Sequence, residues 1–217
     1  MFTVDEVREI YARTARRYDR AVRLFPLLGA RMDRYRRAAV DALGLRHGST
    51  VLDLGCGTGL NFPLLQERVG PAGRIIGVDL TEEMLEGARK RTERLGWSNV
   101  ELVRSDVAEY DVPEGVDAVL STFALTLSPA FDQVIADVAR ALPQRGRLVI
   151  LDLKRPDGWP APLVRFAAWL NRPFAVTLDL GERRPWESVA THLALVDFRE
   201  YYAGAIYLSV GEPRPRP

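Results

Sequence analysis

The sequence predicts a doubly wound α/β domain with a seven-stranded, mostly parallel sheet, and three observations support this prediction. Short apolar runs rich in β-branched residues alternate with amphipathic helical patterns from residue 50 onward. A glycine-rich turn directly follows the first of these runs. The chain has 217 residues, of which 47% are hydrophobic, so it suffices for one large domain but not for two ordinary ones. Buried strands separated by helices imply right-handed crossovers.

The predicted strands and helices follow one another in a regular order. Apolar runs predict parallel strands at Thr50–Leu54, Arg74–Asp79, Val100–Ser105, Val116–Ser121 and Arg147–Leu153. Amphipathic patterns between them predict helices at about Asn61–Val69, Glu82–Leu95 and Phe131–Leu142. Two further runs meet at Gly204 and predict a closing antiparallel hairpin, Val196–Tyr202 and Ala205–Val210. The last strand of the sheet is therefore expected to be antiparallel.

Residues 1–45 precede the sheet and are predicted to form a helical lid. An apolar stripe at intervals of three and four residues, ending at Phe25, marks an amphipathic helix over residues 4–25. Pro26 is expected to end this helix, and a second one follows at about Arg31–Leu43.

Residues 46–211 are expected to form the ligand-binding domain. Within it, residues 155–187 break the regular order as an insert rich in proline and aromatic residues. A helical pattern near Leu163–Leu170 lies inside this insert. Residues 212–217, rich in proline and arginine, are expected to be a flexible tail.

Charge is distributed unevenly along the chain. The net charge is only +1, which argues against obligate nucleic-acid binding. Residues 1–37 nevertheless hold ten arginines against five acidic residues. This basic arm indicates either contact with an anionic surface or a solvated helix, and both interpretations remain open. Peripheral membrane contact through the basic helix is the partner that the first interpretation implies.

Cysteine usage and hydropathy indicate the compartment. Cys56 is the single cysteine, so no internal disulfide can form, and no cluster of cysteine and histidine suggests a metal site. The first ten residues contain acids and lack the apolar run of a signal peptide. No apolar stretch reaches the roughly 18 residues that a membrane span needs. We expect a cytoplasmic protein that can lie at the inner membrane surface.

The turn that follows the first strand indicates the cofactor. It reads Val51-Leu52-Asp53-Leu54-Gly55-Cys56-Gly57-Thr58-Gly59 and occupies the switch point of the sheet, where ligands bind. A nicotinamide dinucleotide site would show the spacing G-x-G-x-x-G, but Leu60 occupies the position of the third glycine. Asp53 would repel a pyrophosphate, whereas it suits a ligand that carries an ammonium and a sulfonium group. The turn therefore favours S-adenosylmethionine over a nicotinamide.

Two further carboxylates follow the next two strands. Asp79 ends the second strand and can accept hydrogen bonds from both ribose hydroxyls. Asp106 ends the third strand, where an acceptor would face the adenine amine. A single aspartate at a strand end is usually only a helix cap or turn residue. The occurrence of Asp53, Asp79 and Asp106 at successive strand ends favours a ligand site instead.

The segments V-L-D-L-G-C-G-T-G and G-V-D-L-T-E-E-M-L resemble the class I S-adenosylmethionine-dependent methyltransferases. In particular they are similar to the UbiE-like branch, which methylates quinones, and to bacterial phosphatidylethanolamine N-methyltransferases. The resemblance covers about residues 50–153, and Tyr18-Asp19 resembles an N-terminal Tyr-Asp element of that branch. By position, it implies that these residues bind the cofactor: Asp53, Gly55, Cys56, Gly57, Thr58, Gly59, Asn61, Asp79, Leu80, Met84, Asp106, Val107, Ser121, Thr122 and Phe123.

Catalytic and acceptor-binding residues are less marked in the sequence. Methyl transfer from a sulfonium requires chiefly orientation of the acceptor and exclusion of water. Tyr18 is the candidate catalytic residue, with Asp19 beside it, because the N-terminal helix can fold over the cofactor. Cys56 is not expected to be a nucleophile, and neither His47 nor His192 is expected to be catalytic. The candidate residues for acceptor binding are Tyr11, Tyr18, Arg183 and Arg184.

The class of acceptor is open between several alternatives. The quinone-methylating branch has a Gly-x-Arg-Asn segment after the fourth strand, whereas residues 121–128 here contain neither Arg nor Asn. N-methylation of phosphatidylethanolamine or a related amine is therefore the first expectation, with Arg183 and Arg184 on the lipid phosphate. C- or O-methylation of a quinone or another small molecule is the alternative. A non-catalytic, cofactor-binding module at a membrane surface is the alternative of another class.

Overall fold

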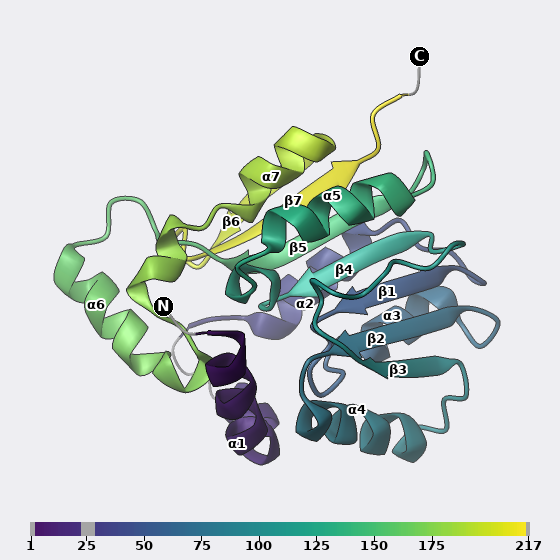
Figure 1. Ribbon diagram of the computed structural model, residues 1–217, viewed down its shortest axis with the longest axis horizontal. Helices are drawn as coiled ribbons and strands as arrows, with labels where there is room; N and C mark the ends of the chain where they lie inside the picture. Colours follow the sequence, from purple (N-terminus) through teal and green to yellow (C-terminus); the bar gives the residue numbers. More distant parts are fainter. Residues whose placement is uncertain (1–2, 23–28, 216–217) are drawn as a thin grey trace.

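The computed structural model describes residues 3–22 and 29–215, and their strands form one seven-stranded sheet in the order β3-β2-β1-β4-β5-β7-β6 (Figure 1). Strands β1 to β5 are parallel, and β7 runs antiparallel between β5 and β6. The strands are β1 Thr50–Leu54, β2 Arg74–Asp79, β3 Val100–Arg104, β4 Ala118–Thr122, β5 Arg147–Leu153, β6 Ala194–Tyr201 and β7 Ile206–Glu212. The predicted fold class is confirmed.

Helices connect the strands and cover both faces of the sheet. They are α1 Val4–Val22, α2 Met32–Ala42, α3 Phe62–Val69, α4 Glu82–Arg94, α5 Phe131–Ala141, α6 Ala161–Leu170 and α7 Pro185–His192. Three short 3₁₀ segments matter for the site: η2 Leu125–Leu127, η3 Arg172–Phe174 and η4 Leu178–Glu182. No helix in the described part of the chain is long and apolar enough to cross a membrane.

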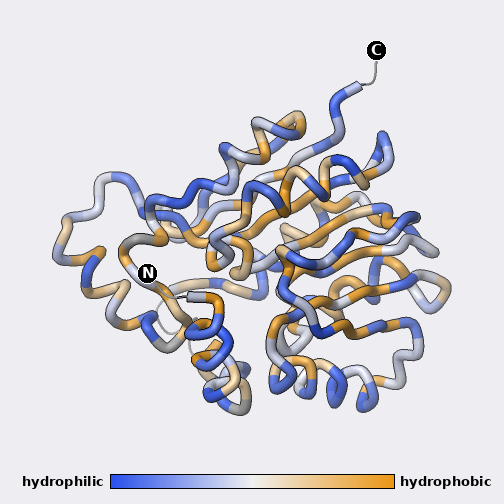
Figure 2. Tube along the Cα trace, viewed as in Figure 1, coloured by the Kyte–Doolittle hydropathy of each residue, from blue (hydrophilic) through white to orange (hydrophobic). Residues whose placement is uncertain are grey.

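The alternation of side chains along the strands produces two hydrophobic layers. Val51 of β1 packs in the layer that holds α2, α3 and α4, whereas Leu52 packs in the layer that holds α5 and α7. Every residue of β4 is buried, as expected for a central parallel strand covered on both faces. Figure 2 shows apolar residues concentrated along the strands. The sheet is therefore a rigid frame whose loops can hold a ligand.

The structure differs from the sequence-based expectations at a few element ends. The fourth strand begins at Ala118 rather than Val116, because its pairing with β1 and β5 starts at Ala118; Val116 is buried outside this pairing. Glu212 belongs to β7 rather than to a flexible tail, since it pairs with Ala194 across the sheet. The expected end of the first helix at Phe25 and Pro26 lies outside the described residues.

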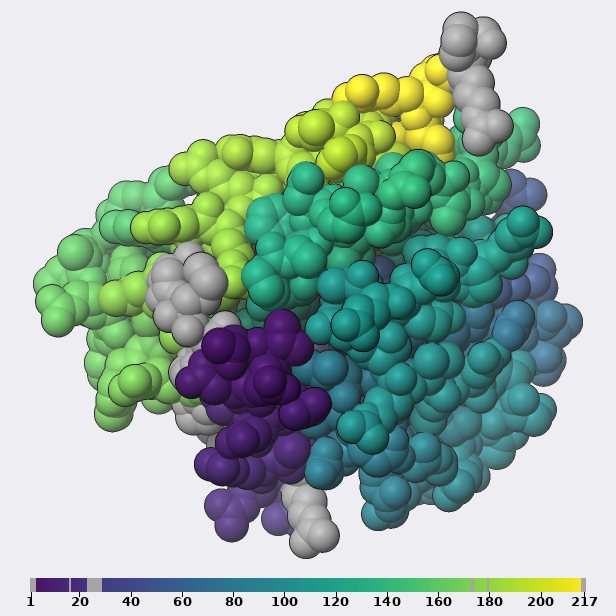
Figure 3. All heavy atoms as spheres, viewed as in Figure 1, coloured from purple at the N-terminus to yellow at the C-terminus, as the bar shows by residue number. Residues whose placement is uncertain are grey.

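The first helix lies across the edge of the sheet where the parallel strands end. It contacts α4 on one side and the η3 segment on the other. Figure 3 shows this helix on the surface, in purple, between the sheet domain and the segment that contains α6. The position of α1 places its side chains over the loops that follow β1, β2 and β4.

Candidate active site

The glycine turn after β1 has a backbone conformation that other residues rarely adopt. Gly55 has φ of 72°, and a Cβ atom at this position would lie 2.2 Å from the Cβ of Ala124. Gly57 has φ of 55° and open space where its Cβ would be. The first glycine therefore allows two loops to approach, whereas the second leaves the turn open to a ligand.

A cavity of about 110 Å³, here called the cofactor cavity, lies along this turn. Eleven of the fifteen expected cofactor residues line it: Gly55, Cys56, Gly57, Thr58, Asp79, Leu80, Met84, Asp106, Val107, Thr122 and Phe123. The first helix adds Val4, Val7, Arg8, Tyr11 and Tyr18 to its walls. Residues from the ends of four strands and from α1 thus meet around one space.

The two carboxylates at the ends of β2 and β3 are held by backbone donors. Asp79 accepts hydrogen bonds from the Gly57 N–H at 2.8 Å and from the N–H and hydroxyl of Thr81 at 2.9 Å. Burial raises the pKa of Asp79 above its usual range. Asp106 accepts from the Ala108 N–H at 2.9 Å, which is the turn-forming role common for such an aspartate. Both residues still line the cavity.

Asp53 lies behind the cavity rather than in its wall. Its side chain is fully buried, and the Asn61 amide donates to both carboxylate oxygens, at 3.2 and 3.0 Å. Burial raises the pKa of Asp53 to about 7, because the carboxylate loses its hydration there. Neither Asp53 nor Asn61 lines the cofactor cavity, so their part in cofactor binding stays a prediction from the sequence.

Gly59 and Ser121 also lie outside the walls of the cavity, for different reasons. A Cβ atom on Gly59 would lie 2.6 Å from the ring of Phe62, so this glycine allows close packing of α3. The Ser121 hydroxyl donates to the Leu54 carbonyl at 2.9 Å and joins β4 to β1. Both residues therefore support the cavity from outside.

Arg36 is a site residue that the sequence-based prediction missed. It projects from α2 with only 6% exposure and donates to Asn61 Oδ1 at 2.7 Å and to Thr122 Oγ1 at 2.6 Å. Its guanidinium lies 5.3 Å from the ring centre of Phe123. Its buried Nε has no hydrogen-bond partner within residues 3–22 and 29–215. A buried cation in the wall of a cavity is suited to an anionic ligand group.

A signal for Arg36 is present in the sequence but hidden among the other arginines of residues 1–37. The buried positions of α2 are Met32, Tyr35, Arg36, Ala39 and Val40, which recur at intervals of three and four. Arg36 is therefore the one arginine on the apolar stripe of this helix. An arginine at a position that the periodicity assigns to the core indicates a buried charge with a specific partner.

Asp19 fastens α1 to the glycine turn. Its carboxylate accepts from the Thr58 hydroxyl at 2.5 Å and pairs with Arg91 of α4 at 2.6 Å. Arg91 Nε also donates to the Thr58 carbonyl at 2.9 Å. This ion pair engages Asp19 in holding the helix, so the structure does not favour it as a catalytic base.

Two tyrosines of α1, Tyr11 and Tyr18, form an aromatic group with Phe174 of η3. Tyr18 lies 5.7 Å from Phe174 and 6.1 Å from Tyr11, measured between ring centres. The Tyr11 hydroxyl donates to the Phe174 carbonyl at 3.1 Å. Burial raises the pKa of Tyr18, so its phenol stays protonated at neutral pH. Tyr18 can therefore donate a hydrogen bond but is poorly suited to accept a proton.

A second cavity of about 60 Å³, here called the inner chamber, adjoins the first. The two cavities share Tyr11, Tyr18, Arg36, Phe123 and Leu127 as wall residues. The remaining walls of the inner chamber include Thr126, Asp152, Leu153 and Phe174. Aromatic rings and apolar side chains thus surround a small space next to the cofactor cavity.

Asp152 is the second site residue that the sequence-based prediction missed. It lies near the end of β5 with 2% exposure and accepts from the Thr126 N–H at 2.9 Å and its neighbour Leu153 N–H at 2.8 Å. Burial raises the pKa of Asp152 to about 6. An acidic residue directly after the apolar run Leu148–Leu151 was the available signal.

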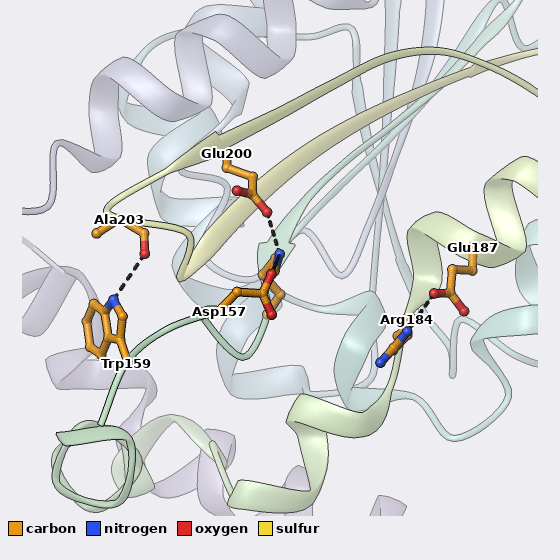
Figure 4. Close-up of polar contacts among 7 residues, drawn as sticks. Asp157, Trp159, Arg184, Glu187, Glu200 and Ala203 are labelled. Carbon is orange, nitrogen blue, oxygen red and sulfur yellow. Dashed lines mark hydrogen bonds and ion pairs between the residues drawn. The ribbon is translucent and has the colours of Figure 1, made fainter. Parts of the chain in front are cut away.

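The two arginines expected to bind a lipid phosphate lie elsewhere. Arg183 is buried and donates to the carbonyls of Thr126 at 2.6 Å and Leu127 at 2.7 Å, so it holds the η2 turn. Arg184 is exposed and pairs with Glu187 at 2.9 Å (Figure 4). Neither residue lines the cofactor cavity or the inner chamber. Binding of a phosphate by Arg183 therefore stays a prediction, and the contacts present hold the η2 turn.

The two histidines also lie away from both cavities. His47 is exposed in the turn before β1, and His192 lies 3.1 Å from Asp132 at the end of α7. Within the described ranges, no group of three or more His, Cys, Asp or Glu side chains is arranged to hold a metal ion.

Comparison with known proteins places the chain in a family. Residues 45–171 match the family described as Methyltransferase domain. Demethylmenaquinone methyltransferase of Listeria welshimeri is 30% identical over 129 residues, which are 58% of this chain and 55% of that protein. Arsenite methyltransferase of Halobacterium salinarum is 37% identical over 114 residues, 52% of this chain and 29% of that protein. The chain thus spans about a third to a half of the length of such relatives.

A solved structure supports the fold. Geranyl diphosphate C-methyltransferase from Streptomyces coelicolor, in complex with Mg²⁺, geranyl diphosphate and S-adenosyl-L-homocysteine, superposes with a TM-score of 0.67 at 15% identity. The superposition covers 84% of this chain and 79% of that structure. The family match agrees with the predicted enzyme class, methyltransferase. By its sequence match and its fold, this chain belongs to the methyltransferase domain family.

Proposed function

We propose that this chain transfers a methyl group from S-adenosylmethionine, bound in the cofactor cavity, to an acceptor whose reactive group lies in the inner chamber. The observation that carries the proposal is the wall that the two cavities share, formed by Tyr11, Tyr18, Arg36, Phe123 and Leu127. Two ligands on either side of this wall would meet near the ends of β1 and β4. Such a meeting point is what a direct transfer between two bound molecules requires.

The residues of the cofactor cavity suit the parts of S-adenosylmethionine. The guanidinium of Arg36, a residue in the wall of the cavity, suits the carboxylate of the methionine part. The open face of Gly57 leaves room for the same part, and Asp79 offers acceptors to the ribose hydroxyls. Asp106 and Val107 are available to the adenine. When bound, this cofactor supplies a methyl group already activated on a sulfonium.

The inner chamber offers a proton acceptor to the second ligand. Asp152 lines the chamber, and the backbone N–H groups of Thr126 and Leu153 fix its carboxylate. With a pKa of about 6, it is mostly ionised at neutral pH. It would accept the proton of an acceptor hydroxyl, whose pKa is about 10 for a phenol. Removal of this proton raises the electron density of the oxygen and of the ring carbons that attack the methyl group.

The chamber favours a ring-bearing acceptor over a phospholipid amine. Tyr11, Tyr18, Phe123 and Phe174 provide ring faces and edges that match a flat ring. The cation of Arg36 and the carboxylate of Asp152 both line the chamber, so their charges offset each other and do not favour a protonated amine there. Demethylmenaquinone methyltransferase, a relative of this chain, is named for a quinone substrate. We therefore place the quinone-type acceptor, expected from the sequence as the alternative, ahead of phosphatidylethanolamine.

Incorporation of labelled methyl groups tests this proposal. The protein is incubated with methyl-labelled cofactor and, in separate reactions, with a reduced naphthoquinone, arsenite and vesicles of phosphatidylethanolamine. We expect label in the quinol and release of S-adenosylhomocysteine. Label only in the phospholipid would show that the amine was the acceptor. Binding of the cofactor without release of S-adenosylhomocysteine across a wide range of acceptors would favour the non-catalytic module.

A further inference from the structure

A third cavity, here called the outer cavity, lies beneath α6 and is the largest of the three. Its volume is about 300 Å³, compared with about 60 Å³ for the inner chamber. Apolar side chains from several segments form much of its wall, among them Leu153, Trp159, Leu163, Phe166, Leu180 and Tyr202. A space of this size with such walls is suited to a hydrocarbon ligand.

The outer cavity adjoins the inner chamber. Both are lined by Met32, Leu153, Asn171, Val176 and Leu180. Met32 has an unbranched side chain with three rotatable bonds, so it can change rotamer to let a chain pass between the two spaces. An acceptor whose reactive group occupies the inner chamber therefore has a route for a substituent into the outer cavity.

Polar contacts hold the inner wall of the outer cavity in place. The Trp159 indole N–H donates to the Ala203 carbonyl at 3.1 Å, which joins the loop before α6 to the β6–β7 turn (Figure 4). Lys154 pairs with Glu200 of β6 and with Asp157 at 3.1 Å. The charge of the Lys154 side chain is thus neutralised at the edge of the cavity. The wall is shaped before any ligand arrives.

The outer wall is an apolar helix without a buried side chain. No residue of α6 is buried, although its only charged residue is Arg165. Phe166 and Trp169 are 57% and 61% exposed, and their rings stack with centres 5.9 Å apart. Half of the large hydrophobic side chains that are exposed in the described chain belong to residues 163–178. A helix of this kind offers apolar surface both to the cavity and to the outside.

We propose that the outer cavity binds a hydrocarbon chain carried by the methyl acceptor, and that residues 155–187 form this chain-binding site. The inference rests on the proposed function for its account of where the reactive group lies. The wall shared with the inner chamber is the reason to assign the cavity to the acceptor. Each methylene group transferred from water contributes affinity, so the affinity for an acceptor should rise with chain length, by at most about fourfold per methylene.

A variant that fills the outer cavity tests the proposal without changing the cofactor cavity or the inner chamber. Ala168 is half-buried on α6 and lines the outer cavity, so Ala168→Trp narrows it. Ala161, on the same helix, is exposed and is not among the wall residues, so Ala161→Trp is the matched control. Calorimetric titration with n-decanol and with geraniol, which both have ten carbons, measures chain binding. Cofactor affinity and melting temperature, measured in parallel, establish that each variant is folded.

We expect both alcohols to bind the wild type and Ala161→Trp equally, and Ala168→Trp at least tenfold more weakly. The ratio between the two alcohols shows whether the site prefers a branched isoprenoid or a straight chain. The inference is overturned if neither alcohol binds the wild type, or if Ala168→Trp binds like the control. It is equally overturned if the protein forms a dimer at higher concentration and the dimer no longer binds either alcohol. The α6 face would then be an interface with a second copy of the chain.

The same titration separates this inference from the proposed function. Alcohol binding that is lost only in Ala168→Trp, in a protein that methylates none of the acceptors, supports the chain site and refutes the proposed function. Methylation of a ring without a chain, by a protein that binds neither alcohol, refutes the chain site and leaves the function intact. If both are correct, a geranyl substituent on the ring lowers KM in the wild type but not in Ala168→Trp.

Discussion

The replacement Asp152→Asn tests whether the inner chamber holds a proton acceptor. The amide keeps the shape of the side chain but cannot accept the proton of a bound hydroxyl. General-base catalysis typically contributes about 10²–10⁴-fold to a rate, so we expect kcat to fall by a factor in this range. The affinity for the cofactor should not change, because Asp152 does not line the cofactor cavity.

The same replacement should change stability much less than activity. Burial shifts the pKa of Asp152 from 3.8 to about 6, so the ionised carboxylate opposes folding at pH 7 by about 3 kcal/mol. The neutral amide removes this cost. It leaves the N–H of Thr126 or of Leu153 without an acceptor, which costs about 1–3 kcal/mol. The two effects nearly cancel, so the free energy of unfolding should stay close to that of the wild type.

The assay is kcat/KM against pH, with urea unfolding of the same samples. In the wild type, kcat/KM should decrease as the pH falls through about 6, because Asp152 becomes protonated. The variant should lack this decrease. Asp111→Asn, at an exposed position, is the control and should behave like the wild type. A variant that keeps the wild-type rate and the same acid limb would refute the assignment of Asp152 as the base.

Three further predictions follow from the same contacts. Arg36→Met should weaken cofactor binding by about 2–5 kcal/mol in calorimetric titration, since it removes the buried cation; unchanged affinity would contradict the carboxylate contact. Gly57→Ala and Gly96→Ala, at φ of 55° and 68° with open space around both, should each cost about 1–2 kcal/mol of stability, but only Gly57→Ala should weaken cofactor binding. Burial raises the pKa of both Asp53 (about 7) and Asp152 (about 6), so the folded state binds more protons than the unfolded state above pH 3.8. The free energy of unfolding should therefore decrease as the pH rises from about 4 to about 7, and an increase in urea titrations would show that these carboxylates are not destabilised by burial.

Local patterns in the sequence predicted the frame of the fold well. The strands at Thr50–Leu54, Arg74–Asp79 and Arg147–Leu153 agree with the structure at both ends, because each is an apolar run bounded by turn residues. The glycine turn was equally clear, since its conformation depends on residues adjacent in the chain. The limits of these local patterns appear at Val116 and Glu212, where strand ends depend on pairing with distant residues.

The site was harder to predict because its distinctive groups come from distant segments. Arg36 reaches Thr122 across 86 positions of sequence, and Asp152 reaches Thr126 across 26. No local spacing encodes either contact. Asp53 shows the opposite problem: its place before the glycine turn was correct, but its carboxylate is held by Asn61 and does not line the cavity. The periodicity of α2 places Arg36 among the buried positions of the helix, and a charge at such a position is a signal of a functional role.

The direction of β7 has a practical consequence for handling the protein. The parallel strands point their carboxyl ends toward the cofactor cavity, whereas β7 runs the other way and leads residues 213–215 to the opposite edge (Figure 1). A purification tag or a surface attachment joined after residue 215 would therefore extend away from both ligands. Any addition before residue 3 would instead adjoin Val4 and Val7, which line the cofactor cavity. Immobilisation for binding measurements should use the C-terminal side.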